Sequence, residues 1–219
     1  MRPLLLDLFC GVGGASRGYQ LAGFHVLGID KAAQPNYCGD DFIQADALEV
    51  AHFAKLADAI HASPPCQHHT TLAKGNNNNQ DDHLDLIDPT RALLVASGKP
   101  YVIENVVSAP IHNPLLLCGE MFGLDVIRHR LFESNVFLWQ PQHKPHRGLV
   151  RGYRHGKRYD GPYFPVYGTG GDKGSLEQWR AAMGMDWAKT KPEIAEAIPP
   201  AYTQYIGEQL LAHVSSEVA

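Results

Sequence analysis

Short apolar runs alternate with segments of helical composition along the first half of the chain. Each run ends at a polar, glycine or proline position, which is typical of buried strands. Helical segments between such runs are typical of crossover helices over a parallel sheet. We therefore expect an α/β fold with a doubly wound, mostly parallel sheet. The expected strands are 4–9, 26–30, 42–46, 59–63 and 101–104, and the expected helices between them are 15–22, 48–56 and 88–97.

The regular alternation stops after Trp139. A segment rich in glycine, proline, histidine, tyrosine and arginine follows, and this composition predicts loops or a small irregular subdomain. Helical signals resume at 176–183 and at 201–214, where apolar residues are spaced for one buried face. Pro199-Pro200 is expected to start the last helix. The pattern divides the chain into one domain, formed by 1–139 and 175–219, and an insertion at 140–174.

Composition places the chain among globular proteins. It has 219 residues, of which 44% are hydrophobic and 19% charged, enough for one core of ordinary size. It contains no apolar run of about 18 residues, and the stretch before Asp7 is too short for a secretory signal. We expect a cytoplasmic protein with no membrane partner. The cysteines at positions 10, 38, 66 and 118 form no Cys-x-x-Cys pair, so neither a disulfide scaffold nor a structural zinc site is indicated, and no metal is expected.

Charge is unevenly distributed along the chain. The formal net charge is −4, but residues 140–173 hold seven Lys or Arg against two Asp. That segment therefore carries +5 and leaves −9 for the rest of the chain. One stretch is suited to a polyanion such as nucleic acid, and the competing interpretation is a basic loop facing solvent.

The first chemical motif is Asp7-Leu8-Phe9-Cys10-Gly11-Val12-Gly13-Gly14, between the first expected strand and helix. Glycines allow a tight turn that brings backbone N–H groups close to a ligand, which favours a nucleotide-like cofactor. The dinucleotide fingerprint needs a third glycine where Ser16 stands, so a nicotinamide or flavin cofactor is disfavoured. Asp30 and Asp46 end the next two strands, where carboxylates can accept ribose hydroxyls and an adenine amino group. The alternative is a glycine-rich turn of any α/β domain.

The second motif is Ser63-Pro64-Pro65-Cys66-Gln67, directly after the fourth strand. Two prolines stiffen the loop and present the next side chain in a fixed direction at the carboxyl edge of the sheet. This setting favours Cys66 as a nucleophile, which would act as a thiolate. A lone cysteine is otherwise more often a small buried apolar residue.

Two further motifs carry charge. Glu104-Asn105-Val106 follows the fifth strand and supplies a candidate acid beside the cysteine loop. Arg128-His129-Arg130 precedes an apolar run, and alternate positions on an extended segment point the same way, so Arg128 and Arg130 can share one ligand. Each motif alone is also compatible with a surface position or a structural ion pair.

Taken in order, these four motifs resemble the cytosine-C5 DNA methyltransferase family. The carboxyl-terminal similarity is looser, since Glu196-Ala197 stand where the family has Gly-Asn, and Val126-Ile127 replace a Gln before Arg-x-Arg. The resemblance implies a Rossmann-like class I methyltransferase fold with S-adenosyl-L-methionine (AdoMet) as cofactor. It further implies a reduced target-recognition insertion at 140–174. The implied cofactor-binding residues are Asp7, Phe9, Gly11, Gly13, Gly14, Asp30, Asp46 and Pro65.

The resemblance also implies a mechanism. Cys66 adds to C6 of cytosine so that C5 can attack the AdoMet methyl, Glu104 stabilises N3, and Arg130 binds O2 with support from Arg128. The target base must be flipped out of the duplex or already single-stranded. Further substrate contacts are assigned to Gln67, Asn105, Arg147, Arg151, Arg154 and Arg158. The sequence offers no clear base for removing the C5 proton, and water is plausible.

Alternatives remain open at this stage. The small insertion also suits a methyltransferase that acts on RNA or on a free pyrimidine nucleotide. A modified AdoMet would transfer a group other than methyl, and a non-catalytic nucleic-acid or AdoMet-binding module would keep the scaffold alone. The motifs fit a restriction-modification or phage enzyme, and they leave open the target sequence, the partner nuclease and the oligomeric state.

Overall fold

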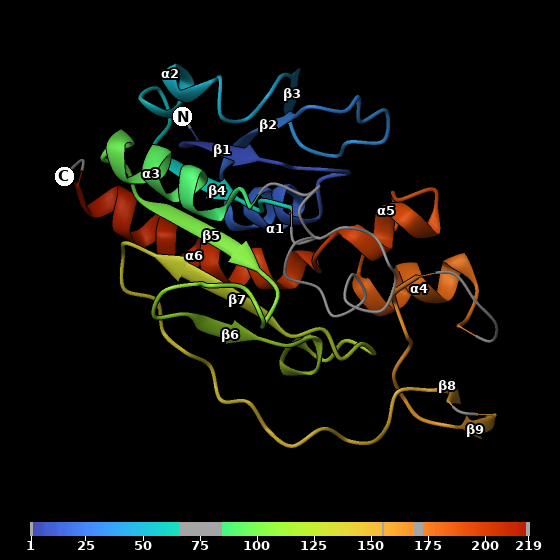
Figure 1. The fold of residues 1–219 in the computed structure, drawn as a ribbon. Helices are drawn as coiled ribbons and strands as arrows, with labels where there is room; N and C mark the ends of the chain where they lie inside the picture. Colours follow the sequence, from blue (N-terminus) through green and yellow to red (C-terminus); the bar gives the residue numbers. More distant parts are fainter. Residues whose placement is uncertain (1, 66–84, 155, 169–172, 218–219) are drawn as a thin grey trace.

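A seven-stranded sheet forms the centre of the molecule. The computed structural model describes residues 2–65, 85–154, 156–168 and 173–217 (Figure 1). The strand order is β3-β2-β1-β4-β5-β7-β6, in which β1 to β5 are parallel and β7 is antiparallel to both of its neighbours. The expected doubly wound, mostly parallel sheet is confirmed. The strands are β1 (Leu4–Leu8), β2 (His25–Asp30), β3 (Asp41–Gln44), β4 (Ala59–Ala62), β5 (Tyr101–Asn105), β6 (Leu115–Leu117) and β7 (Arg130–Ser134).

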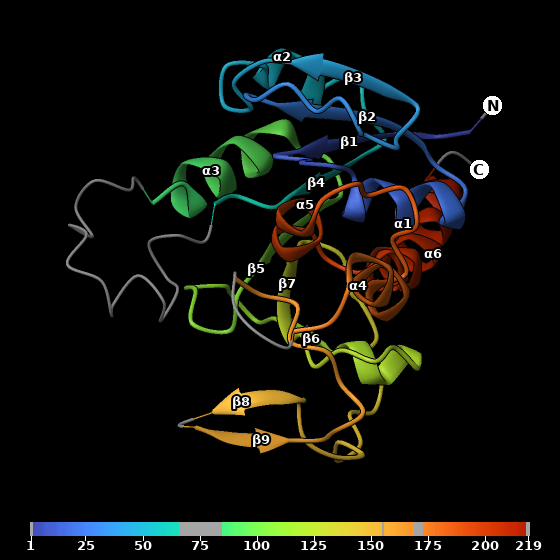
Figure 2. The same ribbon diagram turned by 90° about the vertical axis from the view of Figure 1, so that its right-hand side faces the viewer.

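Helices cover both faces of this sheet (Figure 2). Side chains alternate along a strand, so Leu5 belongs to one apolar cluster and Leu6 to another. The Leu5 cluster includes residues of α1 and α6, and the Leu6 cluster includes residues of α2 and α3. The helices are α1 (Gly14–Ala22), α2 (Ala51–Ala54), α3 (Ile87–Ser97), α4 (Leu176–Met183), α5 (Lys191–Glu196) and α6 (Pro200–Glu217), with a 3₁₀ helix η3 (Gly119–Phe122).

Small residues allow α1 to lie directly against α6 and the turn before it. A Cβ atom added at Gly14 would come within 2.5 Å of the Ile198 carbonyl oxygen. A Cβ at Gly18 would overlap the Thr203 hydroxyl and the Pro200 carbonyl oxygen. The Thr203 hydroxyl donates a hydrogen bond to the Ala15 carbonyl oxygen at 2.8 Å. Glycine at 14 and 18 is therefore required by the distance between the two helices.

A third apolar cluster joins α4 and α5 to the turn after β1. Val12 packs in this cluster with Trp179 and Ile194. The indole N–H of Trp187 donates to the Val12 carbonyl oxygen at 3.0 Å. The carboxyl-terminal helices thus hold the glycine-rich turn in place.

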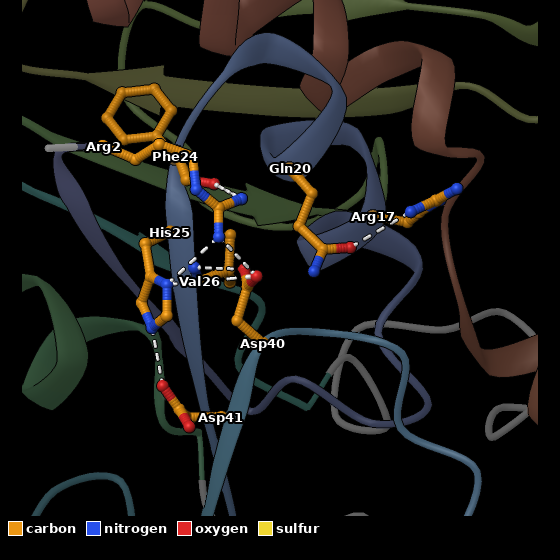
Figure 3. A network of polar contacts seen from close by, with 8 residues as sticks. All are labelled: Arg2, Arg17, Gln20, Phe24, His25, Val26, Asp40 and Asp41. Atoms are coloured by element: carbon orange, nitrogen blue, oxygen red, sulfur yellow. Dashed lines mark hydrogen bonds and ion pairs between the residues drawn. The ribbon is translucent and has the colours of Figure 1, made fainter.

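Polar contacts fix the amino-terminal end of β2 (Figure 3). Arg2 donates to the Phe24 carbonyl oxygen at 3.2 Å and to Asp40 Oδ1 at 2.7 Å. Asp40 Oδ2 accepts the Val26 N–H at 2.9 Å. Partial burial opposes ionisation of Asp40, but the hydrogen bonds from Val26 and Arg2 outweigh it and lower its pKa to about 2. The network pins the segment before β3 to β2.

The segment after β7 contains a short hairpin rather than loops alone. Strands β8 (Gly152–Arg154) and β9 (Lys157–Tyr159) pair antiparallel, with Tyr153 opposite Arg158. Figure 1 shows that the hairpin extends beyond β6, on the side toward which the parallel strands point. Tyr163 and Arg147 both bond Glu120 of η3, the latter through Nε at 2.7 Å. These contacts anchor the base of the hairpin to the sheet domain.

The outer edge of β6 is closed by a side chain. The Leu116 N–H donates to Gln140 Oε1 at 2.8 Å, and Gln140 Nε2 donates back to the Leu116 carbonyl oxygen at 2.8 Å. The amide therefore occupies the position that a further strand would take.

Several expected boundaries differ from the observed ones. The expected helix 48–56 is α-helical only over Ala51–Ala54, because Asp46 accepts the Leu48 N–H at 3.0 Å and holds the preceding residues in a turn. The sequence did not indicate α5, β6, β8 or β9. Among the helices of the described ranges, none is long and apolar enough to cross a membrane.

Candidate active site

The turn after β1 has an unusual backbone. Phe9, Gly11 and Gly13 have φ angles of 60°, 50° and 91°, in the left-handed region. A residue with a side chain rarely adopts this region, so Phe9 is held in a strained conformation by its surroundings. A Cβ at Gly11 would meet no atom within 4 Å, so the turn faces open space there. Strained backbone beside open space at the carboxyl edge of a sheet is typical of a ligand site.

Asp7 lies beneath this turn and is fully buried. Its Oδ2 accepts a hydrogen bond from the Ser16 hydroxyl, and its Oδ1 has no partner in the part of the chain that the structure describes. Burial raises the pKa of Asp7 to about 7, although the Ser16 hydrogen bond opposes the rise. Asp7 therefore supports the turn from inside the core and leaves one polar atom unsatisfied.

Asp30 ends β2 and contacts this turn, and Asp46 follows the end of β3. Asp30 accepts the Gly11 N–H and the Ala32 N–H, both at 2.9 Å. Asp46 lies 3.4 Å from the Lys31 ammonium in addition to its bond to Leu48. A carboxylate has about four acceptor positions, so each can bind a further donor. The arrangement fits the hydroxyl and amino groups of AdoMet, and Asp30 also fixes the turn itself.

Glu104 and Arg130 form an ion pair at the same edge of the sheet. Arg130 begins β7, and the antiparallel pairing of β5 with β7 brings it beside the end of β5. Its Nε lies 2.8 Å from Oε1 of the buried Glu104, and that oxygen has no well-aligned hydrogen bond within the described residues. Burial raises the pKa of Glu104, while Arg130 and Arg128 oppose the rise. A buried carboxyl with a free acceptor beside a guanidinium suits recognition of a polar ring edge.

The residues before Cys66 are held by Asn105. Its side-chain amide donates to the Pro64 carbonyl oxygen at 3.0 Å, and its Oδ1 accepts the Val106 N–H at 2.9 Å. Asn105 is buried, so the structure gives it a positioning role rather than an exposed one. Pro65 is exposed at the end of this segment. Cys66 and Gln67 lie outside the described residues.

Arg128 ties three segments together. Its guanidinium donates to the Val166 carbonyl oxygen at 3.0 Å and to the Ala195 carbonyl oxygen at 2.5 Å. The Tyr202 hydroxyl donates to the Arg128 carbonyl oxygen at 2.6 Å. Arg128 thus fixes the turn before β7 through these contacts, while Arg130 forms the ion pair with Glu104.

A buried polar chain beneath the site was not indicated by the motifs. The ring nitrogens of His61 lie 3.0 Å from the Tyr19 hydroxyl and 2.9 Å from the Ser63 hydroxyl. Burial lowers the pKa of His61 to about 3, so the ring is neutral. The signal in the sequence is a histidine inside a strand expected to be buried on both faces. Ser63 connects this polar chain to Glu104, because its hydrogen bond to Glu104 partly opposes the rise in the Glu104 pKa that burial causes.

The remaining candidates differ in how they are held. Arg147 pairs with Glu120 and lies 3.3 Å from Asp125, so it neutralises acidic side chains of its own chain. Arg151 donates to the Gly161 carbonyl oxygen at 3.1 Å and lies 4.0 Å from the centre of the Phe164 ring. Arg158 Nε is 3.3 Å from Asp160 on the exposed hairpin. The backbone of Arg154 belongs to β8.

The sheet order and the turn after β1 define a class I methyltransferase fold. Solved structures share it at low sequence identity. A protein described as a DNA modification methyltransferase encoded within an E. coli prophage has a TM-score of 0.64 and is 14% identical, with 98% of this chain and 99% of that chain covered. S. pombe Dnmt2 methyltransferase has a TM-score of 0.62 at 15% identity, with 97% of this chain and 99% of that chain covered.

The sequence is similar to type II methyltransferases over part of their length. M.DdeI of Desulfomicrobium norvegicum is 32% identical over 116 residues, which are 47% of this chain and 28% of that protein. M.AgeI of Thalassovita gelatinovora is 24% identical over 214 residues, which are 86% of this chain and 48% of that protein. The chain thus spans less than half the length of these relatives, and no protein-family model matches it. The resemblance to the DNA methyltransferase family is confirmed.

Proposed function

We propose that the protein transfers a methyl group from AdoMet to C5 of a cytosine in DNA through a covalent bond between Cys66 and C6. The observation that carries the proposal is the buried Glu104–Arg130 pair beside the segment that Asn105 holds ahead of Cys66. AdoMet supplies an electrophilic methyl group and leaves as the neutral thioether.

The residues of the chain divide the remaining steps. The Cys66 thiolate forms a bond to C6, and the electron density that moves toward N3 and O2 is met by Glu104 and Arg130. Burial favours the protonated form of Glu104, which can donate to N3 while its other oxygen accepts from the N4 amino group. After C5 gains the methyl group, the C5 proton passes to water and the bond to Cys66 breaks.

Cofactor binding belongs to the turn after β1. Asp30 and Asp46 have acceptor positions for the ribose hydroxyls and the adenine amino group, and the open space at Gly11 admits a ligand. Asp7 and Gly14 act indirectly, through the support of the turn and the approach of α6.

We assign target recognition to residues 140–174. The hairpin carries exposed Arg158 and Tyr153, which suit phosphate contact and stacking on a base. Arg147 instead anchors the segment through Glu120. A segment of this size has little core of its own, so we expect a short or degenerate target sequence. The target base leaves the stack before reaction.

The test offers duplex DNA, RNA and dCMP side by side with labelled AdoMet, followed by digestion to nucleosides and chromatographic identification. We expect label in 5-methyldeoxycytidine from DNA. Label in N4-methylcytosine or N6-methyladenine would contradict the C5 assignment, and label in RNA or dCMP alone would contradict the DNA assignment. AdoMet binding with no transfer to any substrate would indicate a non-catalytic module.

A second experiment tests the covalent step. DNA containing 5-fluorocytosine cannot lose its C5 substituent, so the protein should stay bonded to it when AdoMet is present. Cys66→Ala should abolish the adduct. Cys38→Ala is the matched control and should retain it, because burial raises the pKa of the Cys38 thiol to about 12 and removes it from consideration as a nucleophile. An adduct that maps to another residue would refute the assignment.

A further inference from the structure

Four side chains with metal-binding atoms converge next to the start of β7. Cys118 Sγ and one ring nitrogen from each of His129, His143 and His146 lie within 4.8 Å of one another. His129 Nε2 and His143 Nε2 are 3.0 Å apart, and Cys118 Sγ is 3.6 Å from His146 Nε2. The catalytic steps described above use none of these groups.

Two separations between these atoms are close to those in a tetrahedral site. With metal–nitrogen bonds of about 2.0–2.1 Å and a metal–sulfur bond of about 2.3 Å, ligand atoms lie roughly 3.3–3.6 Å apart. The two measured separations fall close to this range. The three rings are also packed together, with centroids 5.0 to 5.2 Å apart. A metal ion could bind a nitrogen of all three rings at once. The direct contact between His129 and His143 involves only two of them.

The four ligands come as two pairs from separate elements. Cys118 directly follows β6 and His129 directly precedes β7, and the pairing of Leu117 with Arg130 places them opposite each other across the two strands. His143 and His146 form a His-x-x-His pair in the segment that leaves the sheet after β7. Two ligand pairs supplied by distant parts of a chain are typical of structural zinc sites.

We propose that Cys118, His129, His143 and His146 bind one structural Zn²⁺ ion. One thiolate and three imidazoles suit Zn²⁺ rather than the hard cations, which prefer oxygen. Four protein ligands complete the tetrahedron, so the ion stabilises structure and is not a reaction centre. Binding releases the Cys118 proton to solvent.

The ion would fasten residues 140–174 to the catalytic sheet. His129 lies between Arg128 and Arg130, so the same ion would fix the segment that presents Arg130 to Glu104. Arg147 directly follows His146 and makes the neighbouring anchor to Glu120. The zinc site therefore couples the order of the insertion to the position of a proposed substrate-binding arginine.

The first experiment measures metal in the whole protein, purified without chelator, by mass spectrometry of the elements, and needs neither AdoMet nor DNA. We expect about one zinc per chain. After removal of the metal, added ZnCl₂ should raise the melting temperature. Cobalt(II) should give the absorption of a tetrahedral site with a thiolate charge-transfer band.

Variants locate the site. Cys118→Ser and His143→Ala should each weaken zinc affinity by at least about 100-fold in competition with a chromophoric chelator, since even outer contacts of a zinc site contribute 10–100-fold. His112→Ala, an exposed histidine outside the cluster, is the matched control and should retain the wild-type affinity. A wild-type protein that binds no stoichiometric zinc would overturn the proposal, as would full zinc affinity in both ligand variants or another metal in place of zinc.

Discussion

At the scale of single residues, the buried carboxyl of Asp7 makes stability depend on pH. Its pKa is about 7 in the folded protein against an ordinary value of 3.8. The folded state therefore binds the proton more tightly, and between these two values the free energy of unfolding falls as pH rises. The difference between these two pKa values corresponds to about 4 kcal/mol in the free energy of unfolding. This stabilisation is present below pH 4 and is lost as the pH rises to 7.

We predict that Asp7→Asn removes this dependence. The amide oxygen can still accept the Ser16 hydrogen bond, and no charge is buried. The stability of the variant relative to wild type should rise steadily from pH 4 to pH 7, as followed by urea unfolding of ligand-free protein. Asp40→Asn is the control, because the lowered pKa of Asp40 confines its effect to more acidic solutions. Parallel pH profiles of wild type and Asp7→Asn would show that Asp7 is ionised throughout.

Asp30 provides a second prediction for a single residue. Removing a charged acceptor typically costs about 1.5–3 kcal/mol, so Asp30→Ala should weaken AdoMet binding by that amount in calorimetry. Part of the loss comes from the turn, which loses its bond from Gly11. Asp41→Ala is the matched control. This carboxylate is at the amino-terminal end of the neighbouring strand β3, whereas the proposed site is at the carboxyl ends of the strands. Equal AdoMet affinity in folded Asp30→Ala would exclude Asp30 from the site.

The sequence motifs predicted individual site residues unevenly. Asp30 and Glu104 could be proposed from the sequence because acidic residues at the ends of parallel strands meet at one edge. The supporting role that the resemblance implies for Arg128 is compatible with its contacts, but its partners could not be predicted, because they lie 38 and 67 residues further along the chain. The proposed zinc ligands were missed for a similar reason. Only His143 and His146 are close in sequence, and no cysteine stands close enough to them to mark a metal-binding motif.

At the scale of elements, the contact between α1 and α6 sets a strict size limit. Gly18→Ala would ordinarily favour a helix, but here its Cβ meets the backbone and side chain of α6. We predict a loss of at least about 1–3 kcal/mol in the free energy of unfolding, as for overpacked cores. Arg17→Ala, on the exposed side of the same helix, should change it by less than about 0.5 kcal/mol. Equal stability of the two variants would mean that α6 shifts without cost.

Elements were predictable where local pattern and burial agree. The parallel strands are continuous apolar runs, so their positions were correct to within a few residues. The six-residue α5 depends on a capping box of Thr190 and Glu193 rather than on apolar periodicity, and this signal was passed over. β6 is three leucines long, and β8 and β9 are polar, so each lacks the pattern that marks a buried strand.

At the scale of the whole molecule, charge is separated between the hairpin region and the rest of the chain. If the hairpin contacts phosphates, the slope of log affinity against log salt concentration should fall by about one for each cation removed. We predict this for Arg158→Ala and for Arg154→Ala in titrations with duplex DNA. Arg2→Ala removes a cation outside residues 140–173, beside the amino-terminal end of β2, and should leave the slope unchanged. Unaltered slopes in both hairpin variants would indicate a basic loop that faces solvent.

The amide of Gln140 on the outer edge of β6 has a consequence for synthesis of the chain. An apolar strand with an open edge is a template for pairing with other chains. Leu117 leaves the ribosome 23 residues before Gln140, so newly emerged β6 is exposed while β7 is still emerging. Aggregation of nascent chains is therefore most probable within that interval. This interval ends when a single glutamine emerges, before any residue of the hairpin has left the ribosome.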